Sequence, residues 1–394
     1  MVAAAGKLKR VWRECRLGDH VLINSRSVDK NYPHTEIEYL DTGSITQGKI
    51  ETLQHLQLAD APSRAKRIVK DNDIVLSMVR PIQRHYGFLR NVPANMVAST
   101  GFVILTCKDE IDPYFLYSFL TQEDTTEHLD MIAEGSTSTY PAFTPDVVEN
   151  LSINLPPLQE QRAIAAVLSS LDDKIDLLHR QNKTLEGLAS AIWRKMFAEE
   201  AAPDWKSGKL GGITEINPLR SLKKGQVATY LDMSNMPTSG TFPLDWIPRG
   251  YTSGMKFKNR DTIIARITPC LENGKTAYIN FLNENEVAWG STEYVVLSPK
   301  PGYCSEWFYF LARSTDFREF AIQNMTGTSG RQRVSGESIA LYEMLIPPAN
   351  ITRDFGLFAV PAMEHIKHNS LQIRTLSKMR DTLLPKLMSG EIRV

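Results

Sequence analysis

Two groups of cationic, amide and aromatic side chains at expected turns are the residues best suited to chemistry in this sequence. Arginine can pair with the edge of guanine, asparagine and glutamine with adenine, and arginine or lysine with phosphate. These residue types predict contacts to DNA rather than bond breaking, although any one of them can instead be a surface salt-bridge partner. The candidate DNA contacts are Arg80, Gln83, Arg84, Tyr86, Ser138, Thr139, Tyr140, Arg266, Asn273, Lys275, Arg331, Gln332 and Arg333.

Motifs for nuclease chemistry are incomplete. A metal-dependent nuclease needs carboxylates and a lysine around one phosphate. The Asp-Asp-Lys run at residues 172–174 lies in an expected helix, where adjacent residues do not share a face and so do not converge on a metal. The set Asp261, Glu272 and Lys275 is better spaced, with one residue too many between the last two.

Other enzyme classes also lack their signatures. A DNA methyltransferase holds the flipped base with an Asn-Pro-Pro-aromatic motif, whereas residues 154–158 read NLPPL. The phosphate loop of an ATPase is not complete anywhere. His365 and His368 have no convincing third metal ligand. We therefore expect no catalytic residue, no metal site and no cofactor bound by this chain.

The overall charge does not indicate a nucleic-acid partner. Lysine and arginine total 45, as do aspartate and glutamate, so any DNA-binding surface must arise from local segregation of charge. Residues 61–90 contain seven cationic and two acidic residues, whereas residues 120–150 contain seven acidic residues and no lysine or arginine. The first zone is predicted to face phosphate and the second is not. Two solvated faces without a function are an equal alternative.

The sequence predicts a cytoplasmic protein without a membrane partner. Its start has no apolar stretch long enough for a secretory signal, and no later run approaches the ~20 apolar residues that span a bilayer. The four cysteines have no CxxC spacing, so neither a zinc knuckle nor a redox pair is expected.

The chain repeats once, with a period near half its length. The Pro-Pro pair at 156–157 matches the pair at 347–348, an offset of 191 residues, and STGFVIL from Ser99 resembles STEYVVL from Ser291. Each half reads as short strands rich in Val, Ile and Thr, an aromatic helix, a Gly-Ser-Thr loop and one long helix. The aromatic helix is expected to be capped by Asp112 in the first copy and by Ser305 in the second. A duplicated domain is the simplest explanation.

The two long helices carry heptad seams. Apolar residues follow alternating steps of four and three over residues 164–196, interrupted by Asn182. The matching seam over residues 355–387 contains Asn369 and Arg380 as polar members. This pattern predicts an antiparallel coiled coil between the two helices, with the alternative that each packs on its own domain. One asparagine in each seam is expected to fix the register.

The predicted fold class is therefore α+β. Two tandem-related α/β domains are separated by the antiparallel coiled coil, with a pseudo-two-fold axis between the halves. Such domains suit two half-sites of DNA with centres one helical turn apart, ~34 Å, and diverged domains predict two different half-sites. The expected boundaries are 1–155 for the first domain, 156–200 for the first long helix, 201–346 for the second domain and 347–394 for the second long helix.

Two segments carry a family resemblance. The segment from Leu155, LPPLQEQRAIAAVLSSLDDKID, resembles the central conserved region of type I restriction-modification specificity subunits. The segment from Leu376, LSKMRDTLLPKLMSGEIRV, resembles their C-terminal conserved region. The resemblance covers the whole chain, with the domains matched by layout more than by sequence. One departure is that the Asn-Ile-Thr run at 350–352 replaces the Gln-Glu-Gln pattern after the second Pro-Pro pair. This departure puts the equivalence of the two helix starts in doubt.

The resemblance implies a non-catalytic DNA-recognition subunit whose two domains are target-recognition domains. Its implied partners are double-stranded DNA, two modification (methyltransferase) subunits and restriction (translocase and endonuclease) subunits. S-adenosylmethionine, ATP and Mg would be bound by those partners. The competing hypothesis is a protein scaffold that organises partners without reading bases, for which arginines clustered at turns have no use.

Docking of the modification subunits is expected at the start of the first long helix and on the exposed faces of the coiled coil. A capping cluster in the first helical turn is the alternative for residues 159–162. The candidate docking residues are Gln159, Glu160, Gln161, Arg162, Asp172, Asp173 and Arg180.

Overall fold

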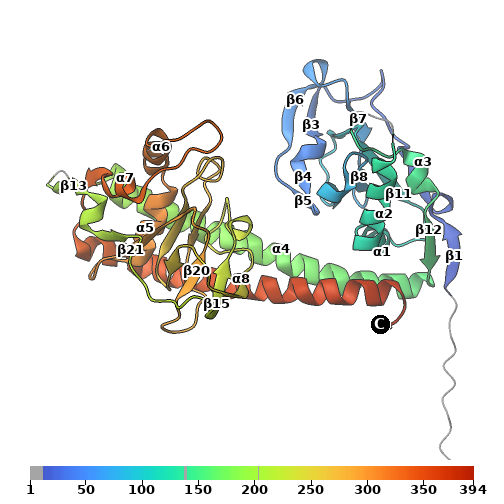
Figure 1. Cartoon of the computed structure of the whole chain (residues 1–394). Coiled ribbons are helices and arrows are strands. Elements are labelled where there is room, and N and C mark those ends of the chain that lie inside the picture. Colours follow the sequence, from blue (N-terminus) through green and yellow to red (C-terminus); the bar gives the residue numbers. More distant parts are fainter. Residues whose placement is uncertain (1–11, 137–139, 203) are drawn as a thin grey trace, which may run out of the picture. The chain divides into compact units, whose positions relative to one another are not determined.

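The computed structural model describes residues 12–136, 140–202 and 204–394. The chain divides into two compact units, one made of residues 1–173 with 378–394 and the other of residues 174–377. The first unit is thus completed by the C-terminal segment. Both units combine small sheets with helices, so the α+β class predicted from the sequence is confirmed (Figure 1).

Two four-stranded sheets build the first unit. All neighbours in the first sheet are antiparallel, whereas two strands of the second, β3 and β10, run parallel. In order, the first sheet contains β2 (Val21–Ile23), β11 (Phe102–Cys107), β8 (Ile74–Ser77) and β9 (Tyr86–Phe88). The second contains β6 (Gln54–Gln57), β3 (Glu36–Leu40), β10 (Met96–Ser99) and β7 (Ala65–Ile68).

The central strand β11 is apolar throughout because both of its faces are buried. Successive side chains of a strand point to opposite faces. Phe102 and Ile104 join a core with residues of the second sheet, whereas Val103 and Leu105 join a core with the helices. A strand covered on both faces reads as a continuous hydrophobic run instead of an alternating one. The sequence STGFVIL therefore specifies a central strand.

The second unit has the same two sheets in the same order. Here too the central strand, β21, divides its apolar residues between two cores, Val295 and Leu297 on one face and Tyr294 and Val296 on the other. The first sheet contains β14 (Thr214–Ile216), β21 (Tyr294–Pro299), β18 (Thr262–Ala265) and β19 (Thr276–Tyr278). The second contains β16 (Ile247–Gly250), β15 (Val227–Leu231), β20 (Ala288–Gly290) and β17 (Lys256–Phe257).

One buried ion pair occurs in both units. Asp73 accepts hydrogen bonds from Arg26 and from Thr106 Oγ1 (2.6 Å), and it is completely buried. Asp261 likewise accepts from Arg220, with 2.8 Å between Nη2 and Oδ1. A buried carboxylate without a partner is costly, so each arginine compensates the charge of its aspartate. The pair also ties the loop that contains the arginine to the start of the strand that follows the aspartate.

The aromatic helices start at the positions expected from the repeat, but their caps differ. Asp112 caps α1 by accepting from the amides of Tyr114 and Phe115 at 2.9 Å, as predicted. The prediction for the second copy is wrong, because Cys304 occupies the cap position and Ser305 is the first helical residue. The shorter helices are α1 (Pro113–Leu120), α2 (Glu123–Glu134), α3 (Pro145–Glu149), α5 (Ser305–Arg313), α6 (Thr315–Gln323) and α7 (Gly336–Ala340).

Three two-stranded sheets and several short helical turns complete the described structure. The sheets are β1 (Arg13–Arg16) with β12 (Ser152–Leu155), β13 (Ser207–Lys209) with β22 (Glu343–Leu345), and β4 (Ile45–Thr46) with β5 (Lys49–Ile50). The 3-10 turns are η1 (Leu17–Asp19), η2 (Thr42–Ser44), η3 (Leu58–Asp60), η4 (Pro81–Gln83), η6 (Leu210–Gly212) and η7 (Met233–Asn235), and η5 (Lys195–Glu199) is a π-helical turn.

Two long helices, α4 (Leu158–Arg194) and α8 (Ala349–Met388), lie side by side (Figure 1). Their first residues are 191 apart, the same offset as the Pro-Pro pairs, so the helix starts are equivalent despite the changed residues at 350–352. In the first unit, Ile164 and Leu168 of α4 share a core with Leu387 of α8. In the second unit, Ala189 of α4 shares a core with Ala359 of α8. Each unit therefore contains its own segment of both helices.

Candidate nucleic-acid interface

The first loop pair consists of residues 79–84, which follow β8, and residues 140–142. The amide of Arg80 donates to the carbonyl of Pro141 at 3.0 Å, and the amide of Phe143 donates to the carbonyl of Met78 at 3.1 Å. Val79 and Ala142 form a β-bridge between the two segments. Two stretches about 60 residues apart in sequence are thus joined into one surface.

Two arginines of the first loop pair adopt left-handed backbone conformations. Arg80 has φ 47° and Arg84 has φ 57°, on either side of turn η4. Such conformations cost an L-residue about 1–3 kcal/mol each and persist only where the surroundings enforce them. Here Pro81 fixes the first turn, and the amide of Arg84 donates to the Pro81 carbonyl at 2.8 Å. The loop presents both side chains from a fixed backbone.

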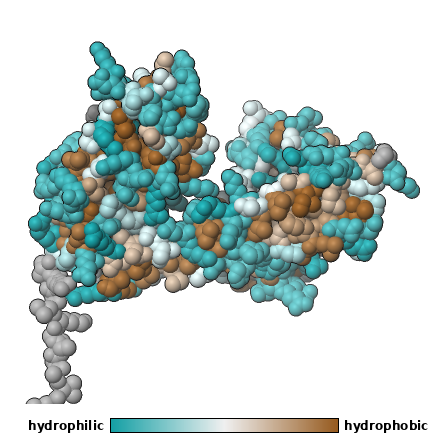
Figure 2. All heavy atoms as spheres, turned by 180° about the vertical axis from the view of Figure 1, so that it is seen from behind, coloured by the Kyte–Doolittle hydropathy of each residue, from teal (hydrophilic) through white to brown (hydrophobic). Residues whose placement is uncertain are grey.

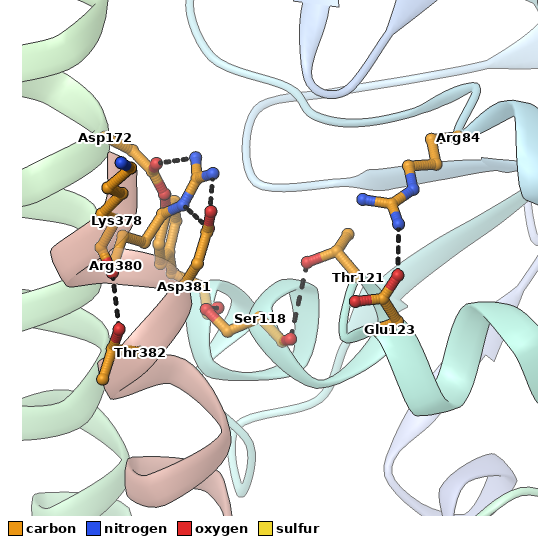
Figure 3. Close-up of polar contacts among 10 residues, drawn as sticks. Arg84, Ser118, Thr121, Glu123, Asp172, Lys378, Arg380, Asp381 and Thr382 are labelled. Atoms are coloured by element: carbon orange, nitrogen blue, oxygen red, sulfur yellow. Dashed lines mark hydrogen bonds and ion pairs between the residues drawn. The ribbon is translucent and has the colours of Figure 1, made fainter. Parts of the chain in front are cut away.

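The side chains of the first loop pair are only lightly engaged. The Arg80 guanidinium lies over the ring of Tyr140, 5.4 Å from its centroid, and both residues are exposed. Arg84 pairs with Glu123 of α2 at 3.0 Å, and the glutamate side chain is 71% exposed (Figure 3). An ion pair this exposed contributes about 0–1 kcal/mol, so it exchanges readily for another anion.

The predicted separation of charge does not hold in space. The acidic residues of α2 adjoin the basic loop, since Glu123 binds Arg84 and Asp130 Oδ1 accepts from the amide of Ile82 at 3.2 Å. The reason is that α2 packs against η4, which sequence distance alone does not reveal. A phosphate approaching Arg84 would therefore compete with Glu123.

The second loop pair consists of residues 266–275 and 331–334, and its backbone contacts repeat those of the first. The amide of Thr268 donates to the carbonyl of Gln332 at 3.1 Å, and the amide of Val334 donates to the carbonyl of Arg266 at 3.0 Å. Ile267 and Arg333 form the matching β-bridge. The structure thus assembles an equivalent surface in the second unit.

The side chains of the second loop pair are more firmly held. Glu293 accepts from both Nε and Nη2 of Arg333 at 2.9 Å, and its carboxylate lies 3.9 Å from Arg266. The hydrogen bonds and the charge of Glu293 raise the pKa of the Arg333 guanidinium. Lys275 Nζ donates to the carbonyl of Met233 at 2.7 Å. Asn273 and Arg331 are exposed and Gln332 is half-buried, so these three are the accessible candidates of this surface.

Of the remaining candidates in the first unit, the structure describes one that is buried and one that is exposed. Tyr86 is buried in the core, where burial raises the pKa of its hydroxyl, so its ring is not available to a ligand. Ser138 and Thr139 lie outside the described residues. Gln83 is exposed on the turn between the two arginines.

The candidate docking residues fall into two sets. Gln159 and Arg162 are exposed and Glu160 is half-buried at the start of α4. Gln161 is buried: its Oε1 accepts from the amide of Asp112 at 2.8 Å, and its Nε2 donates to the carbonyl of Pro156 at 2.9 Å. Gln161 therefore joins the first turn of α4 to α1 instead of facing a partner.

Farther along α4, the candidates bind within their own unit. Asp173 pairs with Arg90 at 2.5 Å, and Arg180 pairs with Asp176 one helical turn away at 2.9 Å. In the second unit, the two seam asparagines meet, since Asn369 Nδ2 donates to Asn182 Oδ1 at 2.9 Å.

Asp172 belongs to a polar network that the sequence reasoning did not foresee. It accepts from Tyr114 Oη of α1 at 2.6 Å and from Arg380 Nη1 of α8 at 2.9 Å, and Arg380 also pairs with Asp381 (Figure 3). Burial, and then Asp172, raise the pKa of the Tyr114 hydroxyl. The available signal was Arg380 itself, because a cation in an apolar heptad seam needs an anionic partner.

The described residues contain no group of three His, Cys, Asp or Glu side chains placed to hold a metal ion. Within the same part of the chain, no helix is long and apolar enough to cross a bilayer. The face seen in Figure 2 is mainly hydrophilic, with hydrophobic patches between the polar residues.

Two curated proteins resemble this chain over most of its length, and a family model matches part of it. The family model of the type I restriction modification DNA specificity domain matches residues 10–187. The specificity subunit of the type I restriction enzyme HindI from Haemophilus influenzae is 25% identical, over 97% of this chain and 99% of that protein. The MjaIX specificity subunit from Methanocaldococcus jannaschii is also 25% identical, over 83% of this chain and 79% of the other.

One solved structure supports the fold. The S subunit of a type I restriction-modification system from M. genitalium covers 98% of this chain and 99% of its own at a TM-score of 0.57, with 18% sequence identity. At this identity the likeness concerns the arrangement of the backbone and not the site residues.

Proposed function

We propose that each unit of this chain, a member of the family of type I restriction-modification specificity subunits, reads one half of an asymmetric, bipartite DNA site. In a type I complex, the chain supplies the DNA sequence specificity. The proposal rests above all on one observation: the same pair of bridged loops occurs in both units with different side chains. The loop pairs are equivalent in backbone and distinct in hydrogen-bonding chemistry, which suits two half-sites of different sequence.

Within the first loop pair, Arg80 and Gln83 are the proposed base readers and Arg84 is the proposed phosphate contact. Arg80 and Gln83 are exposed on a turn whose backbone is fixed. Arg84 is held by an exposed glutamate that a phosphate can replace. In the second loop pair, Asn273, Arg331 and Gln332 are proposed to read bases, and Arg266, Lys275 and Arg333 to shape the surface that presents them.

The two recognition domains are proposed to be tandem copies, residues 1–155 and 201–346, separated by an antiparallel coiled coil of residues 156–200 and 347–394. The repeated sheet order and the repeated buried ion pair support the duplication. The polar contact between Asn182 and Asn369 supports a fixed helix register, because a slipped pairing would leave both amides without this bond. A fixed register sets a fixed gap between the half-sites.

The partners are proposed to be two modification subunits and the restriction subunits, which would bind S-adenosylmethionine, ATP and Mg. Gln159, Glu160 and Arg162 remain the proposed docking residues at the start of α4. Exposed apolar side chains on the long helices support docking there as well, with Leu357 of α8 80% exposed and Leu188 of α4 49% exposed. Leu357 and Val360, three residues apart on α8, are both exposed on one side of the helix, and contiguous exposed apolar surface marks protein interfaces.

The proposal is tested by expressing the chain with its modification subunit and mapping methyladenine in the DNA by single-molecule sequencing. The expected result is one bipartite motif with two different halves. Gln83→Ala is expected to relax a position in one half only, and Asn273→Ala in the other half only. Matched melting curves of the variants control for folding. If both variants leave the motif and its methylation level unchanged, the assignment of the loop pairs as readers is contradicted.

A further inference from the structure

A second exposed element adjoins the first loop pair. Strands β4 and β5 form a hairpin whose two-residue turn is Gln47-Gly48, with φ 48° and 81°. Positive φ at both turn residues is the mark of the tight hairpin turn whose twist matches that of the strands. Ile45 anchors the hairpin in the core, whereas residues 47–50 are exposed. The hairpin is therefore rigid, and its tip, residues 47–49, is polar.

Backbone hydrogen bonds join this hairpin to residues 84–86, at the end of the proposed reading loop. The amide of Gln47 donates to the carbonyl of Arg84, and the amide of Gly48 donates to the carbonyl of Tyr86, both at 2.8 Å. His85 Nδ1 donates to the carbonyl of Ile45 at 2.6 Å. Three residues in succession, 84–86, thus hold the hairpin, which fixes its tip beside Arg84.

The hairpin also has a defined seat on α1. A Cβ atom added at Gly48 would lie 2.7 Å from the hydroxyl of Tyr117, so only glycine fits both the space and the backbone conformation. Because Tyr117 belongs to α1, the turn lies against this helix and is also hydrogen-bonded to residues 84 and 86. The side chains of Gln47 and Lys49 are left on the accessible surface.

We propose that the hairpin tip is a second reading element of the first unit, in which Gln47 reads an adenine edge and Lys49 contacts a phosphate. The inference rests on the proposed function, because it assumes that DNA lies against the first loop pair. A glutamine amide matches the donor and acceptor pattern of adenine, and a lysine contributes a point charge to the backbone. The rigid turn holds the backbone of both residues beside Arg84, so that only their side chains must be ordered on binding.

The second unit has no comparable tip at the corresponding place. The segment between β15 and β18 that lies beside β19 has Thr238, Ser239 and Gly240 there. Its backbone is held by Arg313, which donates to the carbonyl of Thr238 at 2.8 Å, and by Tyr309, which donates to the carbonyl of Gly240 at 3.1 Å. The hairpin effect is therefore expected in one half-site only.

The test uses the full chain with its modification subunit, bound to DNA that carries the mapped motif. Gln47→Ala is expected to relax one position of the half-site read by the first unit by about 10-fold to 100-fold. Lys49→Ala is expected to weaken binding to every sequence and to reduce the salt dependence by about one phosphate contact. Thr238→Ala is the matched control in the second unit, expected to change neither quantity.

Two outcomes overturn the inference in distinguishable ways. If Gln47→Ala and Lys49→Ala leave motif, affinity and salt dependence unchanged while Gln83→Ala still relaxes a half-site, the hairpin is only a support for the loop. If Gln83→Ala is silent as well, the proposed function of the first loop pair fails together with the hairpin. Unchanged melting temperatures are expected in all variants, since the mutated side chains are exposed.

Discussion

The two loop pairs share a backbone and differ in how tightly their cations are held. In the first unit, Arg84 has one exposed glutamate partner and Arg80 lies over a tyrosine ring. In the second, Glu293 binds Arg333 through two nitrogen atoms and lies close to Arg266. Two units can thus share a hydrogen-bonded frame while the side chains on it differ. The frame is fixed by main-chain groups, which substitutions leave in place.

The largest expected effect is on stability, at the buried ion pairs of the two units. Asp261→Ala leaves Arg220, whose side chain is only 9% exposed, without its anion and is expected to cost about 3–5 kcal/mol of unfolding free energy. Asp73→Ala leaves Arg26, which is 33% exposed and can turn to water, and is expected to cost about 2 kcal/mol. Denaturant unfolding of the full chain measures both. Equal losses would contradict the role of arginine burial.

A second prediction compares the polar contacts between the long helices. Asn369→Leu leaves Asn182 Oδ1 without its donor, although Asn182 Nδ2 keeps Ser370 Oγ at 3.2 Å, and is expected to cost about 1–3 kcal/mol. Arg380→Leu is expected to cost about 1 kcal/mol, because its pair with Asp172 is one third exposed. The double variant Asn182→Leu with Asn369→Leu should recover stability in a double-mutant cycle. No recovery would mean that the amide pair is not what the single variant disrupts.

A third prediction concerns the carboxylates that bind the arginines of the two loop pairs. Glu293→Gln removes the anion that holds Arg333 and Arg266, and it is expected to raise non-specific DNA affinity several-fold at low salt. Glu123→Gln frees Arg84 alone and should give a smaller rise. Both are read from binding to an unrelated duplex over a range of salt concentrations. A fall in affinity for Glu293→Gln would show that the carboxylate positions the arginines for DNA.

The smallest expected effect is on the pKa of a histidine in the second sheet of the first unit. His55 of β6 binds Glu38 Oε1 at 2.8 Å, and this hydrogen bond with the charge of the glutamate raises the pKa of the imidazole. Its stabilising contribution is therefore complete below the unfolded-state pKa and is lost as the pH rises through the higher folded-state pKa. A histidine-selective NMR titration is expected to show this shift. Glu38→Gln should reduce it, and an unchanged pKa in that variant would contradict the cause.

Local patterns in the sequence predicted a large part of the fold. The apolar run at residues 102–105 became a central strand, Asp112 became a helix cap, and the heptad seams became two helices that contact each other within each unit. Those patterns depend on nearest neighbours and on periodicity, which the sequence displays directly. The cap predicted at Ser305 was displaced by one residue because Cys304 takes the non-helical position.

The candidate site was predicted less completely. The sequence grouped the candidate residues by half of the chain, and the backbone bonds of Arg80 and Thr268 join the loops that carry them. It did not reveal that Tyr86 and Gln161 are buried, since polar and aromatic residues are common on surfaces and in cores alike. The hairpin at residues 45–50 was also missed, because a two-residue turn between strands of two residues leaves almost no periodic signal.

By itself, the sequence determined the internal repeat, the long helices and the family segments, because each is written as a pattern of neighbouring residues. Only the tertiary structure decided which charges are free. Arg84 meets Glu123 across 39 residues and Arg333 meets Glu293 across 40, and no local rule couples such positions. The affinity of an arginine side chain for a DNA phosphate depends on these partners, since an arginine that is bound to a carboxylate must release it before it binds the phosphate.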